Sequence, residues 1–274
     1  MNLSFTKMQG AGNDFVVFDN RKYNFQLDEI IKLTPRLCHR RFGVGADGLL
    51  VLDTKVTDAN YRMIYRNADG SDAGMCGNGA RCLARFANNN GFGTNLTFMV
   101  HDKAYKAEVS ETEVTILFPV EPKPTDFIEI ESCKALEVYS GTDHVVLWID
   151  DNLIENEPEL RKMGRKIRNM TSLFPRGTNV NFIPKSSSAK SIRMKTYERG
   201  VEDLTLACGT GALATAVSYH KLNHSGESGD FSYEIESNGG ILKTSFNYDS
   251  SVNKYSNLKL TGPAVFVFEG TYFI

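Results

Sequence analysis

Short runs rich in β-branched and aromatic residues recur along the chain, and each has the composition of a β-strand. These runs cover residues 114–118, 145–149, 179–183, 192–197 and 264–268. Four longer segments are interpreted as helices, at about residues 27–41, 77–90, 157–169 and 209–222. Strands dominate this pattern, so the sequence predicts an α+β protein.

Two of the helical segments, 77–90 and 209–222, carry small apolar residues on nearly every face. A helix on the surface of a globular protein keeps one polar face, whereas a helix that is apolar all round is buried. We therefore expect both of these helices to be enclosed by strands.

A proline-rich segment at residues 119–124 divides the chain, because proline cannot continue a central strand. The predicted halves are residues 1–119 and residues 120–262. Gly262 and Pro263 precede the last strand-like run and indicate a return crossing. We expect residues 263–274 to complete the sheet of the first half.

Composition excludes several classes of partner. The 274 residues include 31 Lys and Arg against 33 Asp and Glu, which gives no basic field for a nucleic acid or a membrane surface. No apolar run approaches the roughly 18 residues of a membrane span, and the N-terminal residues lack the pattern of a signal peptide. We expect a cytoplasmic protein. Its five cysteines are odd in number and widely spaced, which is atypical of a disulfide framework.

One short pattern occurs twice, about half the chain length apart. Cys76 and Cys208 each begin a Cys-Gly-x-Gly-Ala sequence that follows a strand and a polar turn and precedes one of the apolar helices. The repeat predicts two similar halves, each with one cysteine at the N-terminus of its buried helix. Similar halves often face each other across a cleft.

A helix N-terminus favours reactive sulfur, because its unpaired N–H groups and positive dipole end stabilise a thiolate or bind a carboxylate. Two such ends on one carboxylate would allow one thiolate to remove an α-proton while the opposite thiol returns one. The alternative is that each cysteine is a small apolar residue packed at a helix start. We interpret Cys38, Cys82 and Cys133, which lack this context, as packing residues. No cysteine or histidine spacing indicates a metal site.

At these residues the sequence resembles the diaminopimelate epimerase family. The resemblance covers nearly the whole chain and rests on the segments 10–15, 41–48, 67–82 and 197–211. It implies two pseudo-symmetric halves, each a curved, mostly antiparallel sheet or barrel wrapped around a central buried helix. It also implies Cys76 and Cys208 as acid/base thiols. The residues whose backbone amides would hold the carboxylate of the reacting centre are Gly77, Asn78, Gly209 and Thr210.

The resemblance further assigns recognition of the distant, non-reacting end of the substrate to Asn13, Asn67, Asn179, Glu198 and Arg199. Arg199 can pair with a distal carboxylate and Glu198 can accept from a distal ammonium, while asparagine amides can bond either group. Taken separately, Asn13 could serve a turn, and Glu198 with Arg199 could form an exposed ion pair.

One tetrapeptide departs from the family. The family usually has Gly-Asn-Pro-His, whereas this chain reads Gly-Thr-Asp-His at residues 141–144. His144 is retained and is expected, with Thr142, to support the site beside the thiols. Asp143 adds a carboxylate near a site that must hold two carboxylates. It could be paired, point away or bind an ammonium, and substrate preference depends on which of these holds.

These features together predict a cofactor-independent, two-base epimerisation of LL- to meso-diaminopimelate. We find neither a phosphate-cradling glycine motif nor a lysine within a motif, so no sequence feature indicates pyridoxal phosphate. The partner is a small amino-acid substrate, and a homodimer is one candidate assembly. Two alternatives stay open: a cofactor-independent racemase of another amino acid on the same scaffold, and an amino-acid-binding protein without turnover.

Overall fold

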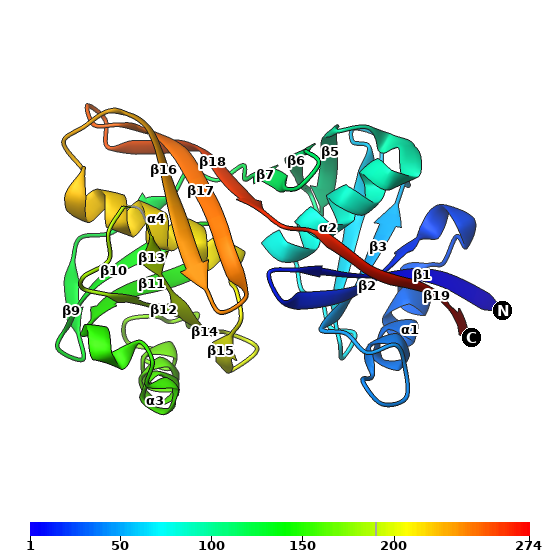
Figure 1. Ribbon diagram of the computed structural model, residues 1–274, viewed down its shortest axis with the longest axis horizontal. Coiled ribbons are helices and arrows are strands. Elements are labelled where there is room, and N and C mark those ends of the chain that lie inside the picture. The colour runs from blue at the N-terminus through cyan, green and yellow to red at the C-terminus, as the bar shows by residue number, and fades with distance from the viewer. Residues whose placement is uncertain (190) are drawn as a thin grey trace. The chain divides into compact units, whose positions relative to one another are not determined.

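The computed structural model describes residues 1–189 and 191–274. The chain forms two compact units (Figure 1). Unit 1 comprises Met1–Leu117 together with Thr261–Ile274, and unit 2 comprises Phe118–Leu260. Within the described ranges, no helix is long and apolar enough to cross a bilayer.

Unit 1 is a single sheet with strand order β7-β6-β5-β4-β3-β2-β1-β19 and two α-helices. Its strands are β1 (Asn2–Gly10), β2 (Asn13–Asp19), β3 (Gly48–Asp53), β4 (Tyr61–Asn67), β5 (Asn95–Val100), β6 (Lys103–Val109), β7 (Val114–Leu117) and β19 (Val265–Phe273). Its helices are α1 (Leu27–Cys38), α2 (Gly77–Ala87), the 3-10 turn η1 (Asn20–Lys22) and the π turn η2 (Asn88–Phe92). The C-terminal strand β19 pairs antiparallel with β1, so the two chain ends lie side by side.

Side chains alternate between the two faces of this sheet, as the pleat requires. One face packs on α1, where Ile30, Leu33 and Leu37 meet Phe18 and Val51. The other face curves around α2, which contacts β1, β2, β3, β4, β6 and β7. Nearly every residue of α2 is buried, which confirms the prediction of an enclosed helix.

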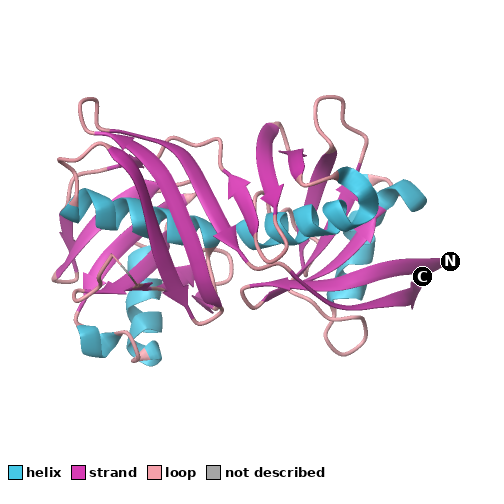
Figure 2. Cartoon of the chain, turned by 45° about the horizontal axis from the view of Figure 1, so that its top comes forward, coloured by secondary structure: helices cyan, strands magenta, loops and turns pink. Residues whose placement is uncertain are grey.

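Unit 2 holds a second buried helix between two sheets (Figure 2). One sheet has the order β15-β14-β12-β11-β10-β8 with β9 beside β10, and the strands that this unit contributes to the other sheet have the order β13-β16-β17-β18. The strands are β8 (Lys123–Pro124), β9 (Ile128–Ile130), β10 (Cys133–Tyr139), β11 (Asp143–Ile149), β12 (Asn179–Pro184), β13 (Ile192–Arg193), β14 (Lys195–Glu198), β15 (Asp203–Thr205), β16 (Gly229–Ser237), β17 (Gly240–Asp249) and β18 (Lys254–Gly262). The helices are α3 (Glu157–Arg168), α4 (Gly209–Asn223) and the 3-10 turn η3 (Asp151–Leu153).

The alternation in unit 2 determines which polar side chains reach the central helix. Val145 and Leu147 of β11 and Val180 of β12 pack with Leu160 of α3 on one face. The residues that alternate with them along each strand point to the opposite face, toward α4, which contacts β10, β11 and β12 as well as β16 and β17. His144 is one of these and is fully buried.

The two units repeat one order of elements. In each unit an antiparallel pair (β1–β2, β10–β11) is followed by an outer helix (α1, α3) and a parallel strand (β3, β12). An antiparallel strand (β4, β14) then leads to the buried helix (α2, α4) and a group of mostly antiparallel strands. The expected α+β class, with mostly antiparallel strands around central helices, is confirmed.

One predicted strand is wrong in detail. The run 192–197 is two strands, because the chain leaves one sheet and enters the other at Met194. β13 pairs in parallel with β16, whereas β14 pairs with β12 and β15. Helix 77–90 also changes character after Ala87, where a π turn containing Gly91 at φ 88° follows. Neither change has a signal in hydrophobic composition alone.

Candidate active site

The two repeated cysteines occupy the same position in their units. Cys76 is the N-cap of α2 with φ −119° and ψ 119°, and Cys208 is the N-cap of α4 with φ −123° and ψ 111°. Both residues are extended immediately before a helix, so the first N–H groups of that helix point toward the cysteine side of the turn. The same local conformation is therefore built twice.

The sulfur of Cys76 lies close to polar groups of unit 1. The N–H of Gly79 lies 3.4 Å from Sγ and donates to it, and Asn13 Oδ1 lies 3.8 Å from Sγ. A donor from the first helical turn stabilises negative charge on sulfur. Cys76 thus has the surroundings of a thiol that can exchange a proton.

A charge network orients Asn13. Its Nδ2 donates to Asp47 Oδ2 at 2.7 Å, which leaves Oδ1 directed to the sulfur. Arg40 contacts Asp47 at 2.7 Å and Asp14 at 2.8 Å, and Lys7 contacts Asp14 at 2.7 Å. Burial opposes ionisation of Asp14, but the hydrogen bonds from Arg40 and Lys7 hold the pKa of Asp14 well below its usual range. The network is charged on both sides and fixes the loop that carries Asn13.

A buried arginine supports the first turn of α2. Arg81 is fully buried, and its guanidinium donates to Gly77 O at 3.2 Å, Asn78 Oδ1 at 2.8 Å and Pro263 O at 3.2 Å. Burial lowers the pKa of Arg81. Its bonds therefore hold Gly77 and Asn78, two residues expected to bind substrate, and join them to the segment that enters β19. The corresponding position on α4 is Leu213.

Asn67 lies at the same end of the unit 1 sheet, where it pairs with Gly48. Its Nδ2 donates to Ser71 Oγ at 3.0 Å, and its backbone closes the turn through Gly70 N and Ser71 O. Ala68 N donates to Asp47 O at 3.1 Å, which links this turn to the loop of Asn13. The structure thus gathers Asn13, Asn67 and the start of α2 at one end of the unit, although the Asn67 side chain binds its own turn.

In unit 2 the sulfur of Cys208 lies beside a hydroxyl group. Thr210 Oγ1 is 3.7 Å from Sγ and 2.9 Å from His144 Nε2. Thr142 Oγ1 lies 2.9 Å from the same imidazole nitrogen and 3.3 Å from Thr210 Oγ1. The expected supporting residues His144 and Thr142 are therefore together with Cys208 and Thr210.

A chain of hydrogen bonds fixes the tautomer of His144. Thr196 Oγ1 donates to Asn181 Oδ1 at 2.9 Å, and Asn181 Nδ2 lies 3.3 Å from Val145 O, an acceptor. Nδ2 therefore donates to His144 Nδ1 at 3.0 Å, which places the imidazole proton on Nε2, toward Thr210 and Thr142. Burial, with a smaller repulsion from Arg199, lowers the pKa of His144 to about 3, so the ring is neutral near pH 7.

Asn179 and Arg199 form the outer part of this half. Asn179 Oδ1 accepts from the backbone N–H of Arg199 at 2.9 Å, and Asn179 Nδ2 donates to Asp143 O at 2.9 Å. The Asp143 carboxylate contacts Arg176 at 2.6 Å and Arg199 at 3.3 Å. The sequence left three possibilities open for Asp143, and in the structure its carboxylate is paired. Glu198 precedes Arg199 at the end of β14, and burial raises its pKa.

The third helical position has little room for a side chain in either unit, and it has less room in unit 2 than in unit 1. A Cβ at Gly211 would lie 2.6 Å from Asn181 Oδ1 and 3.2 Å from Cys208 Sγ. A Cβ at Gly79 would approach Leu50 Cδ2 at 3.1 Å, the end of a flexible side chain. The Gly-x-Gly pattern thus brings the helix start close to its neighbours.

The other three cysteines are buried. Burial raises the pKa of Cys38 and of Cys82 to about 12, and it also raises the pKa of Cys133. Cys38 and Cys133 belong to the hydrophobic cores against α1 and α3. Within residues 1–189 and 191–274, no group of His, Cys, Asp or Glu has the arrangement of a metal site.

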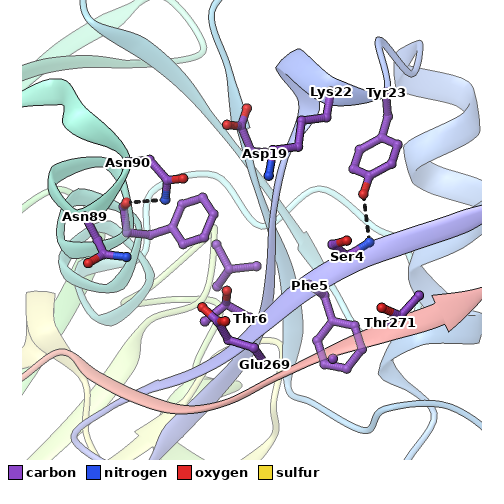
Figure 3. Close-up of a pocket in the computed structure, with 13 residues that line it drawn as sticks. Ser4, Phe5, Thr6, Asp19, Lys22, Tyr23, Asn89, Asn90, Glu269 and Thr271 are labelled. Carbon is purple, nitrogen blue, oxygen red and sulfur yellow. Dashed lines mark hydrogen bonds between the residues drawn. The ribbon is translucent and has the colours of Figure 1, made fainter.

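A hollow of about 420 Å³ in unit 1 lies away from these residues (Figure 3). Its lining includes Ser4, Asp19, Asn90 and Glu269, and Tyr23 Oη closes one side by accepting from Ser4 N at 2.7 Å. Neither the candidate residues of unit 1 nor the start of α2 contributes to it. We therefore place the candidate chemistry at the helix starts, not in this hollow.

The sequence did not single out Asp47, Arg81, Asn181 or Thr196. Asn181 has a usable signal, because two asparagines alternate with Val180 and Phe182 along β12 and must share the opposite face. Arg81 lies between Ala80 and Cys82 in a helix that is expected to be enclosed, which indicates a buried and bonded charge. The partners of Asp47 and Thr196 depend on contacts between distant segments.

The fold is shared with known epimerases and racemases. The chain is similar to the crystal structure of a phenazine biosynthesis protein from Bacillus anthracis, with a TM-score of 0.78 and 13% identity over 100% of both chains. It is also similar to a hydroxyproline epimerase from Agrobacterium vitis, with a TM-score of 0.70 and 14% identity over 99% of this chain and 91% of that one. At these identities the likeness concerns the fold.

Sequence comparison is more specific. The family model described as diaminopimelate epimerase matches residues 5–117 and 136–267, and the chain belongs to that family. It is 38% identical to the diaminopimelate epimerase of Flavobacterium psychrophilum, over 97% of this chain and 98% of the relative. It is 37% identical to that of Chlorobaculum tepidum, over 96% and 99% respectively. The resemblance noted in the sequence is thereby confirmed.

Proposed function

We propose that this chain epimerises LL-diaminopimelate to meso-diaminopimelate, a step toward lysine and cell-wall precursors, without a cofactor. The observation that carries the proposal is the pair of N-cap cysteines, Cys76 and Cys208, with matching backbone conformation and the same Gly-x-Gly suffix. Membership of the diaminopimelate epimerase family supports the choice of substrate.

In the proposed reaction both sulfur atoms must reach one α-carbon from opposite faces. The thiolate of one cysteine takes the α-proton, and the thiol of the other donates a proton to the opposite face. The backbone N–H groups of Gly77, Asn78, Gly209 and Thr210 hold the α-carboxylate, onto which charge develops. Preorganised donors at a helix start stabilise that charge more than the basicity of sulfur could.

Each half supplies a different support for its thiol. Asn13, fixed by Asp47, contacts Cys76. On the other side Nε2–H of neutral His144 donates to a threonine hydroxyl, and Thr210 lies beside Cys208. Because the imidazole stays neutral, it orients the hydroxyl without competing with the cysteines for the proton.

The distal end of the substrate is assigned to Asn13, Asn67, Asn179, Glu198 and Arg199. Arg199 pairs with the distal carboxylate, and Glu198 accepts from the distal ammonium. Asn179 is already bonded to the backbone of Arg199, which supports a positioning role for that asparagine.

The same proposal includes location and assembly. A mechanism that needs two reduced thiols fits the cytoplasm. A homodimer would cover β19, an edge strand on which Val267, Phe268 and Phe273 are about half exposed or more. Light scattering of the purified chain measures this directly: a monomer at micromolar concentration would contradict the dimer.

The decisive experiment is incubation with LL-diaminopimelate in D₂O. Formation of meso product with deuterium at one α-carbon supports the proposal. A second candidate, a racemase of another amino acid, is favoured by Thr142 and Asp143, which depart from the family pattern. Exchange only with another amino acid, for example proline or glutamate, would support that candidate. Binding of an amino acid with no exchange would contradict both and identify a binding protein.

A further inference from the structure

Asp143 has an arrangement that its ion pairs alone do not explain. The carboxylate is mostly buried, with 15% of the side chain exposed, and it contacts two guanidinium groups at once. Oδ1 accepts from Arg176 Nη2 at 2.6 Å, and Oδ2 lies 3.3 Å from Arg199 Nη1. A mostly buried carboxylate that bridges two arginines is held more firmly than an exposed pair.

The same contacts hold Arg199 in place. Nη1 also donates to Arg176 O at 3.1 Å and to Gly177 O at 3.2 Å, while Asn179 bonds to the Arg199 backbone and to Asp143 O. All of these side-chain bonds engage Nη1. Among the described residues, Nε and Nη2 of Arg199 make no hydrogen bond to protein, so one edge of the guanidinium fork remains for a ligand carboxylate.

Charge at this end of unit 2 is mixed. An arginine alone would accept any carboxylate that reaches it. Here the positive charge of Arg199 is shared with Asp143, and Glu198 adds a second carboxylate next to it in sequence. Burial raises the pKa of Glu198, whereas the Asp143 carboxylate contacts two guanidinium groups, at 2.6 Å and 3.3 Å. A ligand end with only a negative charge can pair with Arg199 but gains nothing from the carboxylates, whereas a zwitterionic end meets a partner for each sign.

We infer that Asp143 is a specificity-determining residue. Together with Arg176 it positions Arg199, and its charge selects substrates whose distal end carries an ammonium as well as a carboxylate. This inference rests on the proposed function and names the feature by which that site distinguishes a diamino dicarboxylate from a monoamino dicarboxylate of the same length. Asp143 acts through Arg199 and through its field, so it is not a catalytic residue.

The test compares LL-diaminopimelate with L-2-aminopimelate, which has the same chain length and lacks the distal ammonium. The readout is kcat/KM for α-deuterium exchange, and the discrimination is the ratio of the two values. Asp143→Asn should lower this ratio about tenfold, the factor that corresponds to one charge contact of ordinary strength. The change should lie mainly in KM, because the distal end does not react.

A second variant, Arg176→Gln, is expected to change the discrimination in the opposite direction. Arg176 is 77% exposed, so Arg176→Gln puts little of the fold at risk. Loss of its positive charge leaves Asp143 less neutralised, and discrimination should rise by a few-fold. The matched control is Asp150→Asn, which removes an exposed carboxylate of the same unit that pairs with Lys185 at 2.6 Å. Its ratio should equal that of the wild type.

The outcomes separate this inference from the function beneath it. If the wild type exchanges LL-diaminopimelate and Asp143→Asn lowers the ratio while Arg176→Gln raises it, the inference holds. If the wild type is active and neither variant changes the ratio, the inference is wrong and the proposed function stands. If the wild type exchanges neither substrate, the proposed function fails and the inference fails with it. Thermal unfolding of each variant shows whether a loss of activity is caused by misfolding. If Asp143→Asn does not fold, the discrimination measured for Arg176→Gln decides whether the inference holds.

Discussion

The two units present the same cysteine at the same helix position, yet they surround it with different chemistry. Near Cys76 the groups are charged: Arg81 is buried beneath the helix start, and a network of acids and bases holds Asn13. Near Cys208 they are neutral: a threonine hydroxyl and an uncharged imidazole. The two helix starts therefore share one backbone conformation, whereas the residues that support each cysteine differ. For a reaction that runs in both directions, two unlike supports provide two thiols that need not be equivalent.

The largest expected effect tests whether both halves are needed. Cys76→Ser and Cys208→Ser should each lower epimerisation by about a thousandfold, because a serine hydroxyl is a poor acid or base at neutral pH. Circular dichroism and thermal unfolding should match the wild type, since the substitution is nearly isosteric. Activity within tenfold of the wild type in either variant would restrict the chemistry to one unit.

Arg81 and Leu213 occupy corresponding positions on α2 and α4, and one is charged whereas the other is apolar. Arg81→Met removes the buried guanidinium that donates to Gly77 O, Asn78 Oδ1 and Pro263 O. We expect a loss of about 3 kcal/mol in the free energy of unfolding. Leu213→Met conserves volume and should cost less than about 1.5 kcal/mol. Urea denaturation measures both, and equal losses would show that the buried charge does not distinguish the two helices.

The glycine at the third helical position gives a smaller and equally asymmetric prediction. Gly211→Ala forces Asn181 Oδ1 away from a contact of 2.6 Å, and Asn181 is bonded to Thr196 and His144. We expect about a ten- to hundredfold loss of kcat, since misplaced supports weaken transition-state contacts. Gly79→Ala meets the flexible end of Leu50 and should cost only a few-fold. The reverse order of the two variants would contradict this account of the unit 2 network.

Lowering the pH should destabilise the two units to different extents, and this effect is smaller than those above. Burial lowers the folded pKa of His144 to about 3 and that of His220 to about 4, so below pH 6.5 the unfolded chain binds more protons than the folded one. Each histidine then lowers stability by about 1.4 kcal/mol per pH unit as the pH falls toward those values. Asp14 in unit 1 has a lowered pKa and loses its contribution only below about pH 4.

Unit 2 should therefore open before unit 1 between pH 6 and pH 4. Hydrogen exchange followed by mass spectrometry, corrected for intrinsic rates, reports each unit separately. His220→Gln is the matched variant, and it should reduce the acid sensitivity of unit 2 alone. Simultaneous opening of both units over this range would mean that the buried histidines do not govern it.

The sequence predicts the parts that depend on local pattern. Apolar composition on every face was sufficient to identify α2 and α4 as buried helices, and the repeated Cys-Gly-x-Gly-Ala placed a cysteine at the start of each. Patterns of this kind lie within one helix or strand, so they can be recognised without the fold.

The supports of the two cysteines could not be derived in that way. Asn181 meets Thr196 and His144 because three strands align in register, and Asp143 meets Arg176 across 33 positions of chain. The break at Met194 likewise depends on which sheet accepts each part of the run. Such contacts follow from tertiary structure, and a single sequence contains no direct record of them.

The origin of the hydrogen in the first product shows whether one group or two groups exchange the α-proton. LL-diaminopimelate with protium at both α-carbons is mixed with the enzyme in D₂O, and samples are taken before a tenth of the substrate has reacted. Two thiols on opposite faces predict that the new meso product carries deuterium at the inverted centre while the remaining LL substrate stays protiated. Product that retains the original α-hydrogen would mean that one group both removes and returns the proton, and would contradict the two-cysteine mechanism.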